Sequence, residues 1–577
     1  MEYAALVDVY DRLAATASNN EKRDILAEAF AGAGDLLPRL VVLARGRLFP
    51  AYDRGELGVS SSLTLEAVLA ATGAAEAEVR ERWRETGDLG DAAAWAVDNG
   101  GQQTLFSREL TVERVHDDLR GLADYEGEGS QGRRVDALAG LVSDATADEA
   151  RYVVRTALGH LRVGVGEGTI RDAIAVAFLD GEEGSVDAVE RAYQVTNDFA
   201  VVAETARDGG VDALGELDVE LFRPIQLMLA EKAETLGDGL SDAAADGGEA
   251  VRCEYKYDGI RIQVHVDGDD VRLFTRRLEE VTTQFPDVVR AVREGTAGTA
   301  TERAVFDGEL VGYAPETIRE ESRSPVVFQT LSRRVKRESD IEAMVGEIPV
   351  VVHLFDCLYD GETTLDRPAA ERLERLEAAF SPVDPDPEGG VAGLERAASA
   401  SASPEDPDSA ATLYEEALER GHEGLMMKNA AAAYQPGRRV GRMLKLKPTM
   451  EPLDLVVTRA KYSEGRRSEW LGRLYLACYD SETDEHREVG RLSTGYTDEE
   501  LADLTEELEA RVVNREGRLV ELKPEVVLEV AYEEIQSSTE YDSGYALRFP
   551  RFLGVRPDLG RGDADTLDRV ESLFDSQ

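Results

Sequence analysis

The sequence has little cysteine and no long apolar run. Its 577 residues include three cysteines, Cys253, Cys357 and Cys478, which lie far apart in the chain. They can form neither a disulfide framework nor a four-cysteine zinc site. No stretch of about 18 apolar residues occurs, and the first fifteen residues have neither a basic head nor a hydrophobic signal core. We therefore expect a soluble protein of the cytoplasm that neither crosses a membrane nor is secreted.

Positive charge is also scarce. The chain has 115 Asp and Glu against 65 Lys and Arg, which gives a formal net charge of -50. The acidic residues are spread along the whole chain, while hydrophobic residues still make up 42% and can fill real cores. A dispersed acidic surface is typical of haloarchaeal proteins, because at molar salt the Debye length falls to about 3 Å and self-repulsion is screened. An acidic mesophilic protein that avoids nucleic acid is the alternative, so the charge alone does not identify the partner.

Lysine is largely replaced by arginine, and only nine lysines occur. A lysine can lose its proton and act as a nucleophile, whereas an arginine stays protonated. We therefore expect a lysine that remains in such a chain to be kept for chemistry that arginine cannot perform. The nine are Lys22, Lys232, Lys256, Lys336, Lys428, Lys445, Lys447, Lys461 and Lys523.

The length of the chain predicts several domains, and the pattern of apolar and β-branched residues changes along it. Up to about residue 215, segments such as 74–85 and 148–160 have apolar residues at helical spacing. Between residues 254 and 358, short β-branched runs predict a mixed α+β region. After residue 452, short strands around one helix are typical of a small closed β-barrel such as an OB-fold. We therefore expect a multidomain protein with an all-α domain at 1–235, an α+β domain at 236–449 and an OB-fold domain at 450–577.

Two segments of biased composition predict irregular structure. Residues 237–248 are rich in Gly, Asp and Ala and are expected to form a linker. Residues 381–409 are dominated by Pro, Asp, Ser, Ala and Gly and are expected to form a mobile surface loop within the middle domain.

Lys256 stands in the first segment that points to specific chemistry, which runs from Glu254 to Arg261. The lysine follows a strand-like run and precedes the turn signal Asp258-Gly259, so we expect it at the end of a strand, facing a cleft. A desolvated lysine near other cations has a lowered pKa and becomes a nucleophile. Taken alone, the pattern also fits a hairpin with a surface lysine.

Five further short motifs follow in order, and together they resolve this ambiguity. They lie at residues 274–279, 306–310, 354–358, 423–428 and 444–447. With the lysine motif, they make the sequence resemble the covalent nucleotidyltransferases, and most closely the ATP-dependent DNA ligases of the archaeal and eukaryotic replicative type. The resemblance covers nearly the whole chain. Residues 161–174 resemble a loop-to-helix element of that family's amino-terminal DNA-binding domain, and residues 547–552 resemble a motif of its barrel domain.

The resemblance implies a role for each motif. In this family the lysine that matches Lys256 attacks the α-phosphate of ATP, expels pyrophosphate and carries AMP as a phosphoramidate. The resemblance places Glu254 in the adenylate pocket and Phe355 on the face of adenine. The other implied contacts are Arg261 and Arg276 at the ribose and phosphates, Glu309 and Glu423 at the ribose or a divalent metal, and Lys428, Arg439, Lys445 and Lys447 around the α-phosphate. Oxygen ligands at a phosphate site imply Mg²⁺.

The implied function is an ATP-dependent DNA ligase that joins a 3′-hydroxyl to a 5′-phosphate at a nick, in replication, repair and recombination. The helical domain would then bind DNA, and the middle domain would carry out the adenylation. ATP and Mg²⁺ are the expected cofactors, nicked duplex DNA is the expected partner, and the enzyme is expected to act as a monomer, with a sliding clamp left open as a further partner. Backbone amides of the glycine-rich loop at 161–168, with Arg162 or Arg171, are expected to grip a DNA phosphate. The basic segment 461–473, with Trp470, is the second candidate DNA contact.

Three other functions fit parts of the sequence. A messenger-capping guanylyltransferase or an RNA ligase shares the lysine chemistry, but the long helical amino-terminal domain argues against both. An NAD⁺-dependent ligase is disfavoured because three scattered cysteines cannot form its zinc module. A non-catalytic DNA-binding protein is disfavoured because Lys256, Glu309, Glu423 and Lys445 are all intact.

Overall fold

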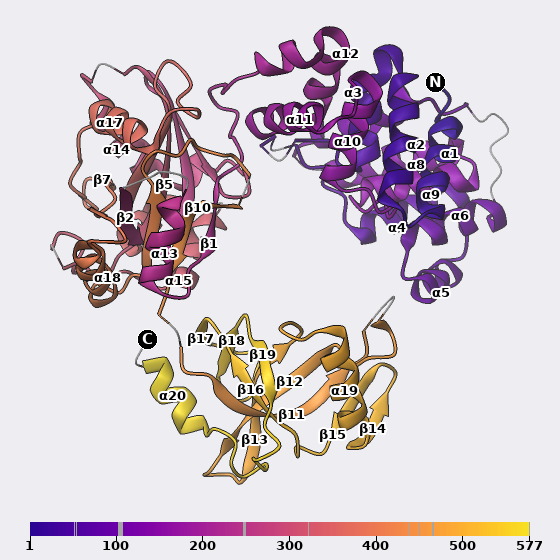
Figure 1. The fold of residues 1–577 in the computed structure, drawn as a ribbon. Helices are drawn as coiled ribbons and strands as arrows, with labels where there is room; N and C mark the ends of the chain where they lie inside the picture. Colours follow the sequence, from indigo (N-terminus) through magenta and orange to yellow (C-terminus); the bar gives the residue numbers. More distant parts are fainter. Residues whose placement is uncertain are drawn as a thin grey trace. The chain divides into compact units, whose positions relative to one another are not determined.

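The computed structural model describes residues 1–577 except 51, 54, 102–107, 128, 246–249, 300, 321, 338, 438, 449, 464–466 and 576–577, and it leaves undescribed the side chains of 439 and 440. The chain divides into two compact units, residues 1–447 and 448–577. The first unit contains a helical region followed by a mixed α/β region, and the second is built mainly of strands (Figure 1). None of the helices in the described ranges is long and apolar enough to cross a membrane.

Helices occupy the first 215 residues, as the apolar spacing predicts. In the first helix Leu6, Tyr10 and Leu13 recur at helical spacing and are at most 1% exposed in the shared core. Thr146 and Glu149 form a capping box at the start of the ninth helix. The helices are α1 (Tyr3–Ala15), α2 (Asn19–Ala31), α3 (Leu37–Arg45), α4 (Ser61–Thr72), α5 (Glu76–Thr86), α6 (Leu89–Asn99), α7 (Val112–Arg120), α8 (Ser130–Asp144), α9 (Ala147–Ala157), α10 (Glu167–Phe178), α11 (Glu183–Thr196) and α12 (Phe199–Gly215).

The mixed region contains two five-stranded sheets, ordered β1-β10-β9-β2-β8 and β4-β3-β5-β6-β7. Its strands are β1 (Leu229–Lys232), β2 (Val251–Lys256), β3 (Ile260–Asp267), β4 (Asp270–Thr275), β5 (Arg303–Gly312), β6 (Val350–Tyr359), β7 (Gly393–Arg396), β8 (Ser399–Ala402), β9 (Gly424–Asn429) and β10 (Arg439–Leu446). Its helices are α13 (Leu236–Ala243), α14 (Pro286–Thr296), α15 (Phe328–Val335), α16 (Ile341–Glu347), α17 (Ala369–Ala379) and α18 (Asp408–Glu419). Between β2 and β3 the chain passes from one sheet to the other, which places the lysine motif between them.

The linker predicted at 237–248 is wrong for its described part. Residues 236–243 form helix α13, which Thr235 caps by accepting a hydrogen bond from the Asp238 amide. Gly239 faces the sheet, where an added Cβ would lie 2.2 Å from Met427 Cε. The glycine therefore serves close packing in this helix, and residues 246–248 lie outside the described residues.

The mobile loop predicted at 381–409 is also wrong, because this segment supplies two strands. β7 pairs in parallel with β6, and β8 pairs antiparallel with β2. The sequence of β8 is Ser-Ala-Ser-Ala, in which small side chains give no apolar alternation. Its strand conformation comes from pairing with β2, a tertiary effect that overrides local composition.

The second unit is a β domain with a seven-stranded sheet and a separate β17-β18 hairpin. Strand β11 pairs with β12, β15 and β16, and β16 pairs in turn with β19. Helix α19 begins with a capping box of Thr497 and Glu500. The sequence predicts one helix in this region, whereas the structure has a second, α20, near the end of the chain. The elements are β11 (Leu453–Lys461), β12 (Arg473–Asp480), β13 (Glu485–Leu492), α19 (Asp498–Glu509), β14 (Val512–Glu516), β15 (Leu519–Leu522), β16 (Val527–Ala531), β17 (Glu534–Ser537), β18 (Tyr545–Arg548), β19 (Arg551–Val555) and α20 (Leu567–Asp575).

Candidate active site

Lys256 is the last residue of β2, as the sequence predicts, and lies opposite Gly424 of β9. Its ammonium forms an ion pair with the Glu423 carboxylate, and both side chains are 18% exposed. The other carboxylate oxygen of Glu423 accepts a hydrogen bond of 2.9 Å from Lys447 Nζ. Burial tends to raise the pKa of Glu423, but the charges of Lys256 and Lys447 outweigh this effect and hold the pKa below its usual range. Two lysines therefore share one ionised carboxylate at the strand end.

Two glycines allow the backbone to come close at this point. At Gly259 an added Cβ would lie 2.4 Å from the carbonyl oxygen of Leu310 on β5. Gly424 has a φ of +134°, and a Cβ there would lie 2.2 Å from the Leu446 carbonyl oxygen. Gly259 is thus required by the passing strand as well as by the turn that the sequence suggests.

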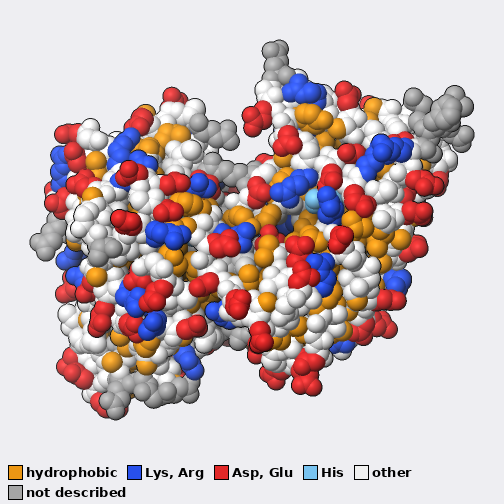
Figure 2. All heavy atoms as spheres, turned by 90° about the horizontal axis from the view of Figure 1, so that it is seen from above, with side chains coloured by type: hydrophobic (Ala, Val, Ile, Leu, Met, Phe, Trp, Pro, Cys, Tyr) orange, Lys and Arg blue, Asp and Glu red, His pale blue; other side chains and the backbone are white. Residues whose placement is uncertain are grey.

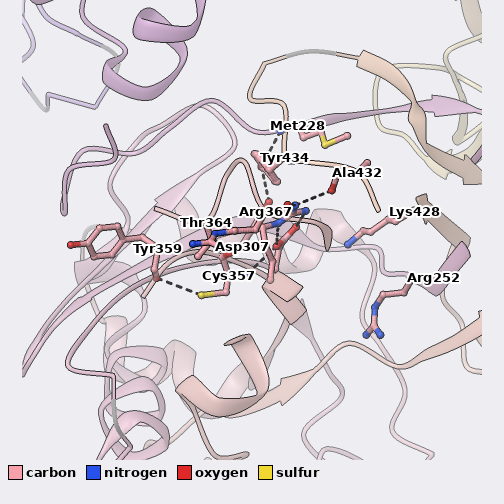
Figure 3. Close-up of polar contacts among 12 residues, drawn as sticks. Met228, Arg252, Asp307, Cys357, Tyr359, Thr364, Arg367, Lys428, Ala432 and Tyr434 are labelled. Carbon is pink, nitrogen blue, oxygen red and sulfur yellow. Dashed lines mark hydrogen bonds and ion pairs between the residues drawn. The ribbon is translucent and has the colours of Figure 1, made fainter. Parts of the chain in front are cut away.

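Glu254 lies two residues before Lys256 and is 2% exposed. One carboxylate oxygen accepts a hydrogen bond of 2.6 Å from Arg252, and the other lies 2.5 Å from Lys428 Nζ. The same Lys428 ammonium lies 4.3 Å from the centre of the Phe355 ring. The resemblance implied Glu254 and Phe355 at the adenine side and Lys428 at the α-phosphate, and the structure brings the three together. It gave no role to Arg252, which β-pairing places directly opposite Lys428 (Figure 3).

Arg261 also lies beside Phe355, with its guanidinium 5.6 Å from the ring centre. A narrow pocket is lined in part by Arg261, Phe355 and Lys428. Arg261 donates two hydrogen bonds, of 3.1 and 2.7 Å, to the carboxylate of Asp307 on β5. Asp307 is fully buried and also accepts a hydrogen bond from Tyr434. Asp307 belongs to the motif at 306–310, but the sequence analysis gave it no role. Tyr434 lies in none of the motifs and could not be identified from the sequence.

Glu309 lies on β5 directly opposite Arg261 of β3. Burial raises the pKa of Glu309 to about 8, with Glu423 and Asp307 adding to the effect and Lys256 and Arg261 opposing it. The Glu309 carboxyl is thus protonated at neutral pH, and a further cation beside it would stabilise its ionised form. Within the described residues no three His, Cys, Asp or Glu side chains are grouped as metal ligands. The arrangement therefore fits Mg²⁺, which takes one or two protein carboxylates and completes its shell with phosphate oxygens and water.

Three more residues were predicted at the site: Lys445, Arg276 and Arg439. Lys445 is in β10, opposite Met426 of β9. Arg276 follows β4 and is exposed, and within the described part of the chain no ion pair links it to the other site residues. Arg439 begins β10, but its side chain lies outside the described residues.

A second cluster of cations lies in the helical region, around a surface hollow of about 420 Å³. Its lining includes Arg45, Arg47, His160 and Arg162. Figure 2 shows that Lys and Arg side chains are scattered among more numerous acidic ones on the face it displays. Arg162 is 51% exposed and has a φ of +60°, in the left-handed region that suits a sharp loop. Arg171, the other predicted phosphate contact, pairs instead with Asp172 and with Glu190 at 2.5 Å.

In the mixed region, a strand-end lysine stands between two sheets, close to buried carboxylates and several further cations. This fold and site define a nucleotidyltransferase domain.

Comparison with known proteins then identifies the family. The family model described as "ATP dependent DNA ligase domain" matches residues 227–447, "DNA ligase N terminus" matches 2–175, and "ATP dependent DNA ligase C terminal region" matches 467–559. A DNA ligase of Thermococcus fumicolans is 41% identical over 580 residues, covering 100% of this chain and 99% of the relative. A DNA ligase of Haloarcula marismortui is 41% identical over 588 residues and covers 100% of both chains. A solved structure titled "Pmar-Lig_PreS3" has a TM-score of 0.56 at 16% identity, covers 95% of this chain and 99% of its own, and shares the fold.

The chain belongs to the ATP-dependent DNA ligases. The predictions of a DNA ligase, of its use of ATP and of Mg²⁺ as its usual metal are confirmed by this membership. The three-part organisation is confirmed as a helical region, a nucleotidyltransferase domain and a carboxy-terminal β domain. The haloarchaeal relatives support the interpretation of the acid excess as an adaptation to salt.

Proposed function

We propose that this ligase seals nicks in duplex DNA through a covalent intermediate on Lys256. In the first step Lys256 Nζ attacks the α-phosphorus of ATP, a nitrogen–phosphorus bond forms, and pyrophosphate leaves. In the second, a 5′-phosphate oxygen at the nick attacks the same phosphorus and frees the lysine. In the third, the 3′-hydroxyl attacks the 5′-phosphate, and AMP leaves. The observation that carries this proposal is the placement of Lys256 at a strand end, paired with Glu423 beside Lys447.

The neighbours of Lys256 support a division of roles. Glu423 and Lys447 fix the direction of the lysine side chain, which favours a productive approach to the phosphorus. Lys428, Lys445, Lys447 and Arg439 are proposed to contact the phosphates, and Arg276 is proposed to reach them from the end of β4. Glu309 and Glu423 would hold Mg²⁺, which supplies charge neutralisation at the phosphates when it is bound.

The adenine and ribose side of the pocket is proposed to involve Phe355, Glu254 and Arg261. The Phe355 ring offers a flat apolar face for a purine. Glu254 is held on both sides by Arg252 and Lys428, so its carboxylate keeps one orientation. A group fixed in this way discriminates between bases better than a mobile one, because it cannot turn to suit the wrong base.

We further propose the domain boundaries 1–235, 236–449 and 450–577, with DNA binding in the first domain, adenylation in the second and an OB-fold barrel in the third. The pairing of β11 with three other strands supports a curled sheet of the kind found in small barrels. The proposal needs one copy of the chain acting in the cytoplasm on nicked duplex DNA, with a sliding clamp as an optional partner.

The hollow of the helical region is the proposed phosphate contact for DNA. Arg47 and Arg162 are exposed beside it, and His160 adds a third donor. The loop that follows His160 leads into helix α10, whose amino-terminal amides add to the attraction for an anion. The basic segment 461–473 is a weaker candidate, because Arg467 is already paired with Asp498 and residues 464–466 lie outside the described residues.

The test is transfer of label from a nucleotide. The purified protein is incubated in molar KCl and Mg²⁺ with α-labelled ATP, α-labelled GTP or adenylate-labelled NAD⁺, separated on a denaturing gel, and then chased with nicked DNA. We expect covalent label from ATP alone, lost as the nick is sealed. Label from GTP alone would indicate a capping enzyme, and label from ATP discharged only by broken RNA would indicate an RNA ligase. No label from any nucleotide would leave a non-catalytic DNA-binding protein.

A further inference from the structure

Tyr434 is a buried residue of the nucleotide pocket that lies between two binding elements. It is 5% exposed, and its hydroxyl accepts a hydrogen bond of 3.0 Å from the Met228 amide. The same hydroxyl donates one of 2.9 Å to Asp307 Oδ2. Figure 3 shows Met228, Tyr434 and Asp307 together at this side of the pocket.

Arg261 closes these contacts into a ring. Its Nε and Nη2 donate to the two oxygens of Asp307, and its Nη1 donates at 2.7 Å to the Met228 carbonyl. One residue, Met228, thus contributes its amide to Tyr434 and its carbonyl to Arg261. All three nitrogens of the Arg261 guanidinium are used in the ring, so its plane is fixed before a nucleotide arrives.

Tyr434 is itself held rigidly from outside the ring. Its amide donates to the Leu365 carbonyl at 2.8 Å, and the Arg372 guanidinium lies 5.6 Å from its ring centre. Arg372 forms two hydrogen bonds, of 2.8 and 2.9 Å, with Asp356 and a third, of 3.1 Å, with the Ala432 carbonyl. These contacts restrict the backbone and the aromatic side chain of Tyr434.

We propose that Tyr434 is a positioning residue, which sets the direction of Arg261 and thereby the affinity of the pocket for ATP. The inference rests on the proposed role of Arg261 at the ribose and phosphates. Burial, with a further contribution from Asp307, raises the pKa of Tyr434 well above its ordinary value, so the hydroxyl stays protonated and keeps donating to Asp307. Among the described residues, loss of that hydroxyl would leave Asp307 with Arg261 as its side-chain partner and remove the acceptor of the Met228 amide.

The test compares Tyr434→Phe with Tyr10→Phe. Tyr10 is also fully buried and donates a hydrogen bond of 3.1 Å to the Leu43 carbonyl, but it lies in the helical region. The measured quantity is the ATP concentration that gives half of the maximal single-turnover rate of self-adenylylation. Tyr434→Phe removes two hydrogen bonds, and we expect the half-saturating concentration to rise about three- to tenfold, the range that the loss of the one to Asp307, which orients Arg261, gives. The maximal rate should change less than the half-saturating concentration, and Tyr10→Phe should leave that concentration unchanged.

An unchanged half-saturating ATP concentration in folded Tyr434→Phe would overturn the inference, and so would an equal rise in Tyr10→Phe. If Tyr434→Phe loses its thermal unfolding transition at the assay temperature, Asp307→Asn replaces it. This variant keeps the side-chain shape and removes the charge that orients Arg261, and the same rise is expected. Label on the wild-type protein that maps elsewhere than Lys256 would instead contradict the proposed function, which keeps the two failures distinct.

Discussion

The nucleotide pocket and the hollow of the helical region both gather cations in a protein with a formal net charge of -50, but the two sets of cations differ in their exposure to solvent. In the pocket, Lys256, Lys428 and Arg261 each have a carboxylate partner, and their side chains are between 11% and 18% exposed. At the hollow, Arg162 is 51% exposed although it lies 3.6 Å from the Asp88 carboxylate, and for the exposed Arg47 no ion pair occurs among the described residues. The cations of the pocket are mostly shielded from solvent before a ligand arrives, whereas Arg47 and Arg162 at the hollow remain open to it.

This difference matters most in concentrated salt. Buried charge pairs are screened much less than exposed ones, whose interactions are short-ranged when the Debye length is about 3 Å. ATP binding should therefore depend little on salt, while DNA binding at the hollow should depend on it strongly. The same buried carboxylates also mean that a nucleotide phosphate must displace Glu423 or Glu254 from a lysine, or arrive with a metal that binds them.

Replacing the nucleophile is expected to have the largest effect. Lys256→Ala removes the amine that forms the bond to AMP, so self-adenylylation should fall by at least about a thousandfold, to background. Lys336→Ala is the matched control, because Lys336 is an exposed lysine of the same domain. The measurement is uptake of label from α-labelled ATP on a denaturing gel. Covalent label that persists in Lys256→Ala would show that the buried cluster is organised around another nucleophile.

A second prediction concerns pH and Glu309. The folded protein holds a proton on Glu309 up to a pKa of about 8, whereas in the unfolded chain this carboxyl has its ordinary pKa of 4.5. Glu309 therefore contributes its full stability below pH 4.5 and loses it as the pH rises towards 8. In EDTA, the Tm of the wild type should fall more between pH 5.5 and 8.5 than that of Glu309→Gln, by roughly 2–4 °C, because Tm shifts are small in a unit this large.

Mg²⁺ provides the control for this second prediction. A divalent cation that binds the ionised form of Glu309 competes with its proton, so stabilisation by Mg²⁺ should grow as the pH rises. In Glu309→Gln this growth should be smaller. Parallel Tm curves for the two proteins in EDTA would mean that Glu309 is ionised in the pocket, and the contrast between an organised pocket and a solvated hollow would lose this support.

Much of the pocket could be predicted because its residues lie in short motifs whose order is specific. The run from β2 to β5 is rich in β-branched residues, so a mixed α+β region was predicted there, and the position of Lys256 at the end of a strand is confirmed. The grouping of Lys256 with Glu423 followed from the resemblance, and the structure brings the two into an ion pair.

The supporting contacts could not be predicted, because they join segments that are far apart in sequence. Tyr434 and Asp307 are separated by 127 positions, and neither local composition nor periodicity links them. Strand β8 was missed for a related reason, since four small residues become a strand only by pairing with β2. Local pattern thus indicated the residues proposed to touch the nucleotide, while tertiary structure was needed to find those that hold them in place.

The smallest predicted effect lies at the hollow. Arg47→Ala and Arg162→Ala should each weaken binding to nicked DNA by about two- to tenfold at 1 M KCl, because each removes a contact to phosphate. Self-adenylylation should be unchanged, since no DNA takes part in that step. The measurement is the Kd for nicked duplex DNA between 1 and 3 M KCl. If an arginine neutralises one phosphate, the slope of log K against log salt should become shallower by about 0.9 in its variant.

Arg207→Ala is the matched control, because Arg207 belongs to the same helical region but is already paired with Asp208. Its loss should leave both the Kd and the slope unchanged, since that guanidinium neutralises its own carboxylate before DNA arrives. A slope that changes in Arg207→Ala as much as in Arg162→Ala would mean that the helical region attracts DNA through its overall field. A slope that stays constant in all three variants would place the DNA contact outside the hollow. A change confined to Arg47 and Arg162 would place the DNA contact at the hollow, and a larger change for Arg47 than for Arg162 is expected because Arg162 already lies 3.6 Å from the Asp88 carboxylate.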